Sequence, residues 1–253
     1  MKNLLKKTVK GILGERSKTY VNLYYKFYHK SVFPSMDHIV NLYAKVKPEV
    51  FFMQIGANEG STEDPLYRQI RLRNWKGILV EPLPEEFKNL KNNYKDSPQL
   101  IFENVAISHQ EESRPFYYVR KDVGGVPFWV TKLSSFDRKI PEEVLETYPK
   151  AEIASFDVKC TTVHQLIRKN QVKKVDLLFI DTEGFDYEIL KTVDLAQIMP
   201  EVIVYEHRHL SADDHKESIG MLKGLGYYVY QAEHDTIAFT NEELKKTYTD
   251  HLV

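Results

Sequence analysis

The sequence predicts an α/β fold, with an open and mostly parallel sheet of seven strands covered by helices on both faces. One strand-like run, residues 50–55, ends in a glycine-rich turn at 56–60, and a second, residues 77–80, ends in Glu81. Two strands separated by one helix-length segment are typical of the first βα unit of such a sheet. A third run, residues 175–180, is almost entirely apolar, which indicates a central strand buried on both faces.

The other elements follow from hydrophobic runs and the turn residues between them. Further strands are expected at 100–107, 116–119, 156–162, 202–205, 227–231 and 236–239. The last two are expected to close the sheet as a hairpin with an antiparallel C-terminal strand. Helices are expected at 62–73, from Pro84 onward, and at 164–170, 185–193 and 213–224. We expect residues 1–47 to form a helical extension and residues 48–253 to form the main domain.

Composition narrows the class of protein. The 253 residues carry a net charge of −1, which gives no general attraction to nucleic acid. The single cysteine, Cys160, excludes an internal disulfide and suits a reducing compartment. No apolar stretch approaches the roughly 20 residues that span a bilayer, and lysines interrupt the N-terminal segment where a signal peptide would be apolar. These features predict a cytoplasmic protein.

The N-terminal segment is strongly basic. Residues 1–30 contain eight lysines and arginines against Glu15 alone, a net charge of 8 − 1 = +7. Apolar residues within 5–13 share one helical face, which is typical of a helix that lies on an anionic membrane surface. Aromatic residues at 20–28 also follow a helical period. For residues 20–28 the favoured explanation is a helical cap that packs its aromatic stripe on the main domain, and for residues 1–13 the cap and the membrane surface explain the pattern equally well. The oligomeric state is not predicted.

The glycine-rich turn and Glu81 together predict a cofactor that contains a ribose. A carboxylate at the tip of the second strand accepts hydrogen bonds from ribose hydroxyls about 20 residues after the glycine turn. Gly60 and Glu81 are 81 − 60 = 21 residues apart. The turn lacks the third glycine that brings a pyrophosphate onto a helix N-terminus. It resembles instead the S-adenosylmethionine (SAM) loop of class I methyltransferases.

Five stretches of the sequence, in the same order, resemble the FkbM-type family of SAM-dependent methyltransferases. They read FFMQIGANEG, GILVEPLPEEFKNL, ENVAIS, VDLLFIDTEGFDYEIL and EVIVYEH, and they lie within residues 48–240. The resemblance implies a Rossmann-like class I methyltransferase fold that transfers methyl groups to hydroxyls of sugars, glycans or secondary metabolites. Phe179 stands where the family often has a lysine, so a basic side chain near the cofactor is missing.

The resemblance also assigns roles around the cofactor. The methionine part of SAM would lie over the turn, Glu81 would bind the ribose, and Asp181 would lie near the transferring methyl. The adenine would be bordered by three residues after the third strand. The implied cofactor-binding residues are Gly56, Ala57, Asn58, Gly60, Glu81, Asn104, Val105, Ala106 and Asp181.

Polar residues follow four expected strands, at the sheet edge where open α/β sheets bind ligands. Methyl transfer to oxygen needs a group that helps the acceptor proton to leave, and histidine is the usual base near neutral pH. His207 is therefore a candidate catalytic base, oriented by Glu206 or Asp181. A structural histidine bonded to a neighbouring strand is an equally good explanation of His207.

The same three residues, Asp181, Glu206 and His207, are also candidate ligands for a divalent cation, Mg²⁺ or Mn²⁺. A bound cation would polarise an acceptor hydroxyl and lower its pKa. Magnesium prefers oxygen ligands, so the histidine favours a softer metal.

Residues 121–153 contain scattered glycines and prolines and form the candidate acceptor lid. Its aromatic rings are expected either to stack on a sugar or an aromatic acceptor or to anchor a long loop, and they belong to Phe128, Trp129 and Phe136.

Two other classes of protein remain open. They are a nucleotide-sugar or NAD-binding enzyme, disfavoured by the missing glycine, and a non-catalytic binding protein that keeps the fold. Nucleic-acid methylation is disfavoured by the near-neutral charge.

Overall fold

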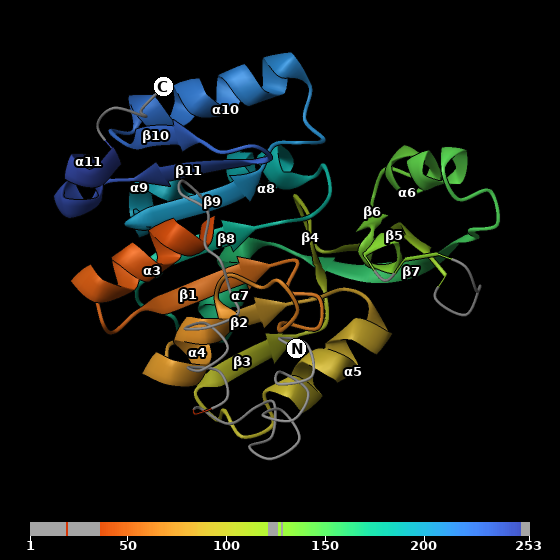
Figure 1. Ribbon diagram of the computed structural model, residues 1–253, viewed down its shortest axis with the longest axis horizontal. Helices are drawn as coiled ribbons and strands as arrows, with labels where there is room; N and C mark the ends of the chain where they lie inside the picture. Colours follow the sequence, from red (N-terminus) through yellow and green to blue (C-terminus); the bar gives the residue numbers. More distant parts are fainter. Residues whose placement is uncertain (1–18, 20–35, 121–125, 128, 249–253) are drawn as a thin grey trace, which may run out of the picture.

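The computed structural model describes residues 19, 36–120, 126–127 and 129–248. Its main sheet has seven strands in the order β3-β2-β1-β8-β9-β11-β10 and fills the left half of Figure 1. The strands are β1 (Phe51–Ile55), β2 (Lys76–Val80), β3 (Leu100–Glu103), β8 (Leu177–Ile180), β9 (Val202–Glu206), β10 (Tyr228–Gln231) and β11 (Asp235–Phe239).

The pairing of these strands confirms the predicted fold class. β1 pairs in parallel with β2 and with β8, and the parallel pairing continues outward to β3 and β9. β11 is antiparallel to both of its neighbours, β9 and β10. The C-terminal hairpin and the antiparallel strand were therefore predicted correctly, and the carboxyl ends of β1, β2 and β8 meet at one edge.

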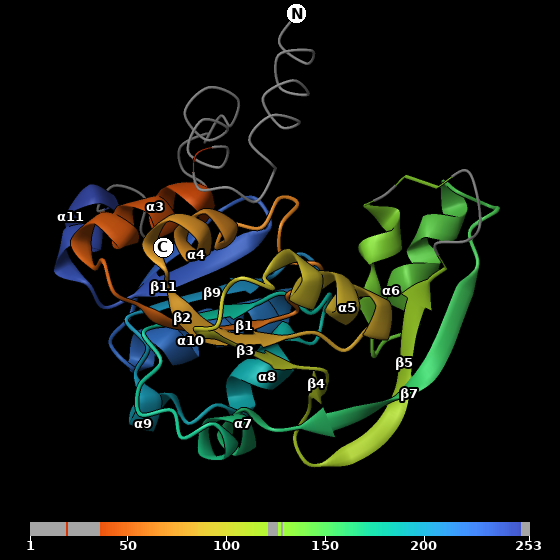
Figure 2. The same cartoon turned by 90° about the horizontal axis from the view of Figure 1, so that it is seen from below.

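Helices cover both faces of the sheet, as Figure 2 shows. One face packs against α3 (Met36–Val46), α4 (Tyr67–Arg73), α5 (Pro84–Asn93) and α11 (Glu242–Tyr248). The other packs against α7 (Val163–Lys169), α8 (Asp186–Thr192), α9 (Leu195–Ile198) and α10 (Ala212–Gly224). Successive strand residues point to opposite faces, so Phe52 belongs to the first core and Met53 to the second.

The helix α3 lies within the predicted N-terminal extension, yet it is part of the main core. Ile39, Val40, Tyr43 and Ala44 are completely buried in the same cluster as Phe52. The basic segment at 1–30, including the aromatic positions 20–28, lies outside the described residues apart from Thr19. None of the described helices is long and apolar enough to cross a membrane.

A second sheet, which the sequence did not predict, extends from the main domain (right half of Figure 1). Its strand order is β4-β7-β5-β6, from β4 (Ala106–Ile107), β5 (Glu112–Val119), β6 (Ser134–Ser135) and β7 (Ile153–Thr161). β5 and β7 form a long antiparallel pair that carries β6, η1 (Val130–Lys132), α6 (Lys139–Glu142) and η2 (Glu143–Glu146). We call residues 112–161 the β5–β7 arm. The predicted lid is therefore the outer part of this arm, and Phe128 lies outside the described residues.

Candidate active site

A cavity of about 290 Å³ opens at the carboxyl ends of β1, β2 and β8. Of the nine residues that the sequence assigned to the cofactor, eight line it, namely Gly56, Ala57, Asn58, Gly60, Glu81, Val105, Ala106 and Asp181. The chain segments that carry them are far apart in sequence and meet because three parallel strands end at one edge. The structure thus brings the predicted cofactor residues together, while their binding roles remain a prediction.

Glycine is required at position 56 of the turn. Gly56 has a φ of +84°, and a Cβ there would lie 1.7 Å from the Asp181 carbonyl oxygen. The amides of Gly56 and Ala57 both donate to the Val80 carbonyl at 3.0 Å. The turn therefore packs directly against the ends of β2 and β8, and its backbone forms the floor of the cavity.

The Glu81 carboxylate is buried at the tip of β2, with 3% of the residue exposed. One oxygen accepts the amide of Asn58 at 2.7 Å, and the other accepts the amide of Leu83 at 2.8 Å. A carboxylate oxygen can accept a second hydrogen bond, so two ribose hydroxyls have acceptors here. Asn104 does not line the cavity, and its side chain donates instead to the carbonyls of Glu81 and Pro82.

The chain after the glycine turn does not form a pyrophosphate site. A helix was expected from residue 62, but α4 begins only at Tyr67. The Asp64 carboxylate occupies the preceding turn and accepts the amides of Leu66 and Tyr67 at 2.7 and 3.0 Å. The cradle formed by the turn therefore lacks a free helix N-terminus. Together with the Glu81 carboxylate, it fits a ribose-containing ligand that has no pyrophosphate.

Carboxylates are concentrated along the same edge. Burial and the neighbouring Glu183 raise the pKa of Asp181 well above its usual value. Burial, together with the charges of Asp181 and Glu183, raises the pKa of Glu206 to about 10. Burial likewise raises the pKa values of Asp186 and Asp235 to about 6. So many buried carboxylates repel one another, and a cation at this edge would relieve the repulsion.

The structure does not place His207 with Asp181 and Glu206. Its ring stacks on that of His215 with centroids 4.1 Å apart, and its Nδ1 lies 3.0 Å from the Thr236 hydroxyl. Burial and the two neighbouring histidines lower its pKa to about 4. This geometry matches the alternative of a structural histidine. Among the described residues, the group that could hold a metal with Glu206 contains His209 and not His207, and the catalytic roles of Asp181, Glu206 and His207 stay a prediction.

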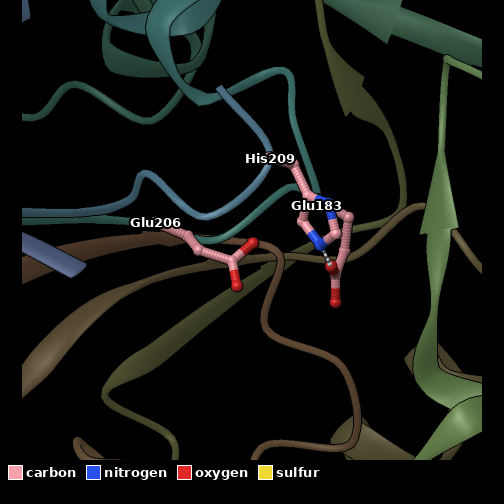
Figure 3. A group of neighbouring side chains, drawn as sticks. All are labelled: Glu183, Glu206 and His209. Carbon is pink, nitrogen blue, oxygen red and sulfur yellow. Dashed lines mark ion pairs between the residues drawn. The ribbon is translucent and has the colours of Figure 1, made fainter. Parts of the chain in front are cut away.

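The side chains that do converge at this edge are Glu183, Glu206 and His209 (Figure 3). Adjacent residues of an extended chain point to opposite sides, so His207 turns away from Glu206. A turn closed by the Leu210 amide and the His207 carbonyl then brings His209 back over the edge. His209 Nε2 lies 3.1 Å from Glu183 Oε2. Only the turn geometry, which the sequence does not specify, distinguishes His209 from His207.

The β5–β7 arm supplies a basic side chain to the cavity. Lys132 lines it, with its Nζ 3.3 Å from Glu59 Oε2 and 3.2 Å from the Thr62 carbonyl. The positive charge of Lys132 helps to keep the pKa of Glu59 low despite burial. Phe179, which replaces the expected lysine, is itself buried in the cavity wall. A basic side chain therefore reaches the cavity from a distant segment, which sequence patterns did not reveal.

The strand order and the cavity define a Rossmann-like methyltransferase domain of class I. The profile of the methyltransferase FkbM domain matches residues 54–229 of the sequence. The chain belongs to this family of SAM-dependent methyltransferases. None of the curated proteins compared matches the sequence.

Several solved structures of methyltransferases resemble the chain at low sequence identity. A methyltransferase FkbM from Methylobacillus flagellatus KT is 13% identical, with a TM-score of 0.48 over 76% of this chain and 44% of that one. An O-methyltransferase from Bacillus cereus in complex with SAH is 13% identical, with a TM-score of 0.42 over 94% and 97%. A SAM-dependent O-methyltransferase from Thermotoga maritima is 11% identical, with a TM-score of 0.43 over 88% and 71%. The chain spans less than half the length of the first of these.

Proposed function

We propose that this protein binds SAM and transfers its methyl group to a hydroxyl oxygen. The observation that carries the proposal is the acidic edge formed by Asp181, Glu183 and Glu206 beside a cavity that contains Glu81. Carboxyls whose pKa values are raised by mutual repulsion ionise more readily beside a cationic ligand, which their charge then stabilises, whereas an anionic ligand would raise their pKa values further. SAM carries a positive sulfonium, whereas NAD carries a negative pyrophosphate.

The residues of the cavity would hold SAM in a single orientation. Glu81 would accept hydrogen bonds from the ribose hydroxyls, and Val105 and Ala106 would border the adenine. The turn containing Gly56 and Asn58 would lie under the methionine part. Bound SAM supplies a methyl group on a positively charged sulfur, which is open to attack by oxygen.

Transfer breaks the bond between carbon and sulfur, forms a bond between carbon and the acceptor oxygen, and releases the hydroxyl proton. The protein must align the oxygen with the methyl and weaken the O–H bond. Among the described residues, Glu183, Glu206 and His209 form the polar group placed for this task. Their position at the strand ends fits an acceptor that approaches from the β5–β7 arm.

The acceptor is proposed to be a sugar, a glycan or a secondary metabolite with a free hydroxyl. Phe136 and Phe185 line the cavity with their rings 5.0 Å apart. Trp129 is 53% exposed and packs edge-on against Tyr148 in the outer arm. Aromatic faces of this kind stack on sugar or aromatic rings, and the outer arm is the proposed acceptor lid.

Two other functions make different predictions. An NAD-binding enzyme needs a helix N-terminus at the glycine turn, which the late start of α4 at Tyr67 does not provide. A non-catalytic binding protein would bind SAM without turnover. Calorimetric titration with NAD distinguishes the first from the proposal, and turnover distinguishes the second.

The test of the proposal is the formation of S-adenosylhomocysteine by the purified chain with a panel of hydroxyl acceptors, such as sugars, glycans and phenols. We expect turnover with one acceptor class and loss of at least tenfold in Asp181→Asn. SAM binding without turnover for any acceptor would contradict transferase activity and support the non-catalytic alternative. Turnover with amine acceptors alone would contradict transfer to oxygen.

A further inference from the structure

Three side chains from two strand ends point toward one another next to the cavity, as Figure 3 shows. Glu183 follows β8, Glu206 ends β9, and His209 lies in the turn after β9. We propose that Glu183, Glu206 and His209 bind one divalent transition-metal cation.

The spacing of the donor atoms suits a single ion. His209 Nε2 and Glu183 Oε2 are 3.1 Å apart, close to the ~3 Å that separates adjacent ligands on an ion with bonds of about 2.1 Å. One donor atom from each of the three residues lies within 4.8 Å of the other two. Two ligands on one ion are at most about 4.2 Å apart, so no pair of these donor atoms needs to close by more than about 0.6 Å, which is within the reach of a side-chain rotation.

One donor atom of the cluster has no hydrogen-bond partner among the residues that the structure describes. Glu206 Oε2 is buried and accepts no hydrogen bond from the described part of the chain. No lysine or arginine among the described residues forms an ion pair with Glu183 or Glu206. A buried carboxylate without a partner is costly, and an ion held jointly with His209 would satisfy it.

The backbone holds the other two ligands close together. Glu183 has a φ of +52° and Gly184 a φ of +97°, so the chain turns sharply after β8. A Cβ on Gly184 would lie 3.3 Å from the His209 Cβ, so glycine allows the histidine to approach. Ser135 of the β5–β7 arm donates to the Glu183 carbonyl at 2.7 Å. The histidine and this carboxylate are therefore preorganised.

The donor set selects the kind of metal. Two carboxylates and one imidazole suit manganese, iron or zinc better than magnesium, which prefers oxygen alone. Three protein ligands leave coordination positions open for water or substrate. Glu183 also lines the cavity, so a bound ion would lie beside the proposed place of methyl transfer.

The role of the cation rests on the proposed transfer to oxygen. An acceptor hydroxyl in the open position would have a lowered pKa, and its proton would pass to water. The resulting oxygen would attack the methyl, with the carbon–sulfur bond breaking as the carbon–oxygen bond forms. Glu183, Glu206 and His209 would act as ligands, and none of them would need to accept the proton.

Manganese is the probe for the test, because free Mn²⁺ gives an electron paramagnetic resonance signal that decreases on binding. The full chain, stripped with EDTA and dialysed, is titrated with MnCl₂ as wild type, Glu206→Gln and His209→Asn. We expect one bound ion per chain and an affinity at least tenfold lower in each variant. Asp213→Asn and His164→Asn are the matched controls, since both residues are exposed and lie outside the cluster, and they should bind Mn²⁺ like wild type.

Thermal melting keeps the test decisive if a variant folds poorly. Mn²⁺ should raise the melting temperature of wild type and of both controls, and Glu206→Gln, still folded in EDTA, should show no such shift. Absence of Mn²⁺ binding by wild type, or equal affinity in wild type and the variants, would overturn the site. Calorimetry with SAM in EDTA tests cofactor binding without any metal. SAM binding without Mn²⁺ binding would overturn the metal site and leave the proposed function intact. Mn²⁺ binding without SAM binding would overturn the proposed function and leave the metal site intact.

Discussion

Single residues at the sheet edge account for the shape of the cavity, and Gly56 shows this most directly. Its φ is +84°, and only 1.7 Å would separate a Cβ at this position from the Asp181 carbonyl oxygen, which leaves no room for a side chain. The turn and the end of β8 can meet only because this position is glycine.

Gly56→Ala is expected to destabilise the protein by at least about 2 kcal/mol, because positive φ and a backbone clash act together. Gly220→Ala is the matched control. Gly220 lies within α10, and an added Cβ would have nothing within 4 Å except its chain neighbours and the backbone of its own helix, so alanine should stabilise by roughly 0.5–1 kcal/mol. Chemical denaturation measures both changes. Equal stability of Gly56→Ala and wild type would contradict the packing described here.

The Glu206 carboxyl gives a prediction for pH dependence. Its pKa is raised from 4.5 to about 10, first by burial and then by Asp181 and Glu183. A raised pKa favours the protonated form in the folded state, so its contribution to stability is complete below pH 4.5 and is lost as the pH rises toward 10. Between pH 7.5 and 8.5 the histidines with lowered pKa values are largely deprotonated in both states.

In EDTA, the free energy of unfolding is therefore expected to fall over this window, by at most about 1.4 kcal/mol per pH unit for one proton. Glu206→Gln should flatten the slope, because it removes this group and its repulsion of Asp181. Denaturation curves at pH 7.5, 8.0 and 8.5 measure it. A slope that is the same in the variant and in wild type would argue against a protonated Glu206.

At the scale of elements, local patterns predicted the parallel strands well and the β5–β7 arm poorly. Residues 50–55, 77–80 and 175–180 are hydrophobic runs whose partners are adjacent strands of the same kind. In contrast, β4 follows β3 closely in sequence but belongs to the second sheet, where Ala106 pairs with Cys160, 160 − 106 = 54 positions later. A hydrophobic run predicts that a segment forms a strand, but it does not say whether the strand pairs in the main sheet or in the arm. The second sheet could therefore not be predicted from the sequence.

One hydrogen bond ties the arm to the active-site edge. Ser135 in β6 is 1% exposed, donates to the Glu183 carbonyl at 2.7 Å and accepts the Asp137 amide at 3.2 Å. Ser135→Ala is expected to cost about 1–2 kcal/mol of stability and to lower turnover more than SAM affinity, because Glu81 is untouched. Ser155 in β7 is exposed, so Ser155→Ala serves as the control. Denaturation and steady-state kinetics measure the effects, and unchanged turnover in Ser135→Ala would show that the arm does not position Glu183.

At the scale of the whole molecule, the sequence was sufficient for the fold class and for the position of the cofactor cavity. Both depend on regular features, namely alternating strands and helices and a carboxylate 21 residues after a glycine. The identity of the converging histidine was not accessible, because His207 and His209 differ only in the turn that follows β9. Lys132 was missed for the related reason that it reaches the cavity from the arm.

The basic segment at residues 1–30 is proposed to contact an anionic membrane surface, while the protein itself is proposed to be cytoplasmic. Its net charge of +7 predicts binding that depends on lipid charge and weakens with salt. Co-sedimentation with liposomes containing phosphatidylserine should retain the full chain and release a chain that begins at residue 31. Neutral phosphatidylcholine liposomes are the control. Equal retention of both chains would contradict this role.

The central claim is that the cavity binds SAM with Glu81 on the ribose, and calorimetric titration of SAM and S-adenosylhomocysteine into wild type and Glu81→Ala tests it most directly. We expect micromolar binding by wild type and a loss of at least tenfold in the variant, because hydrogen bonds to a charged group contribute about 1.5–3 kcal/mol. A folded wild-type protein that binds neither compound, or a variant that binds both as tightly as wild type, would contradict the account.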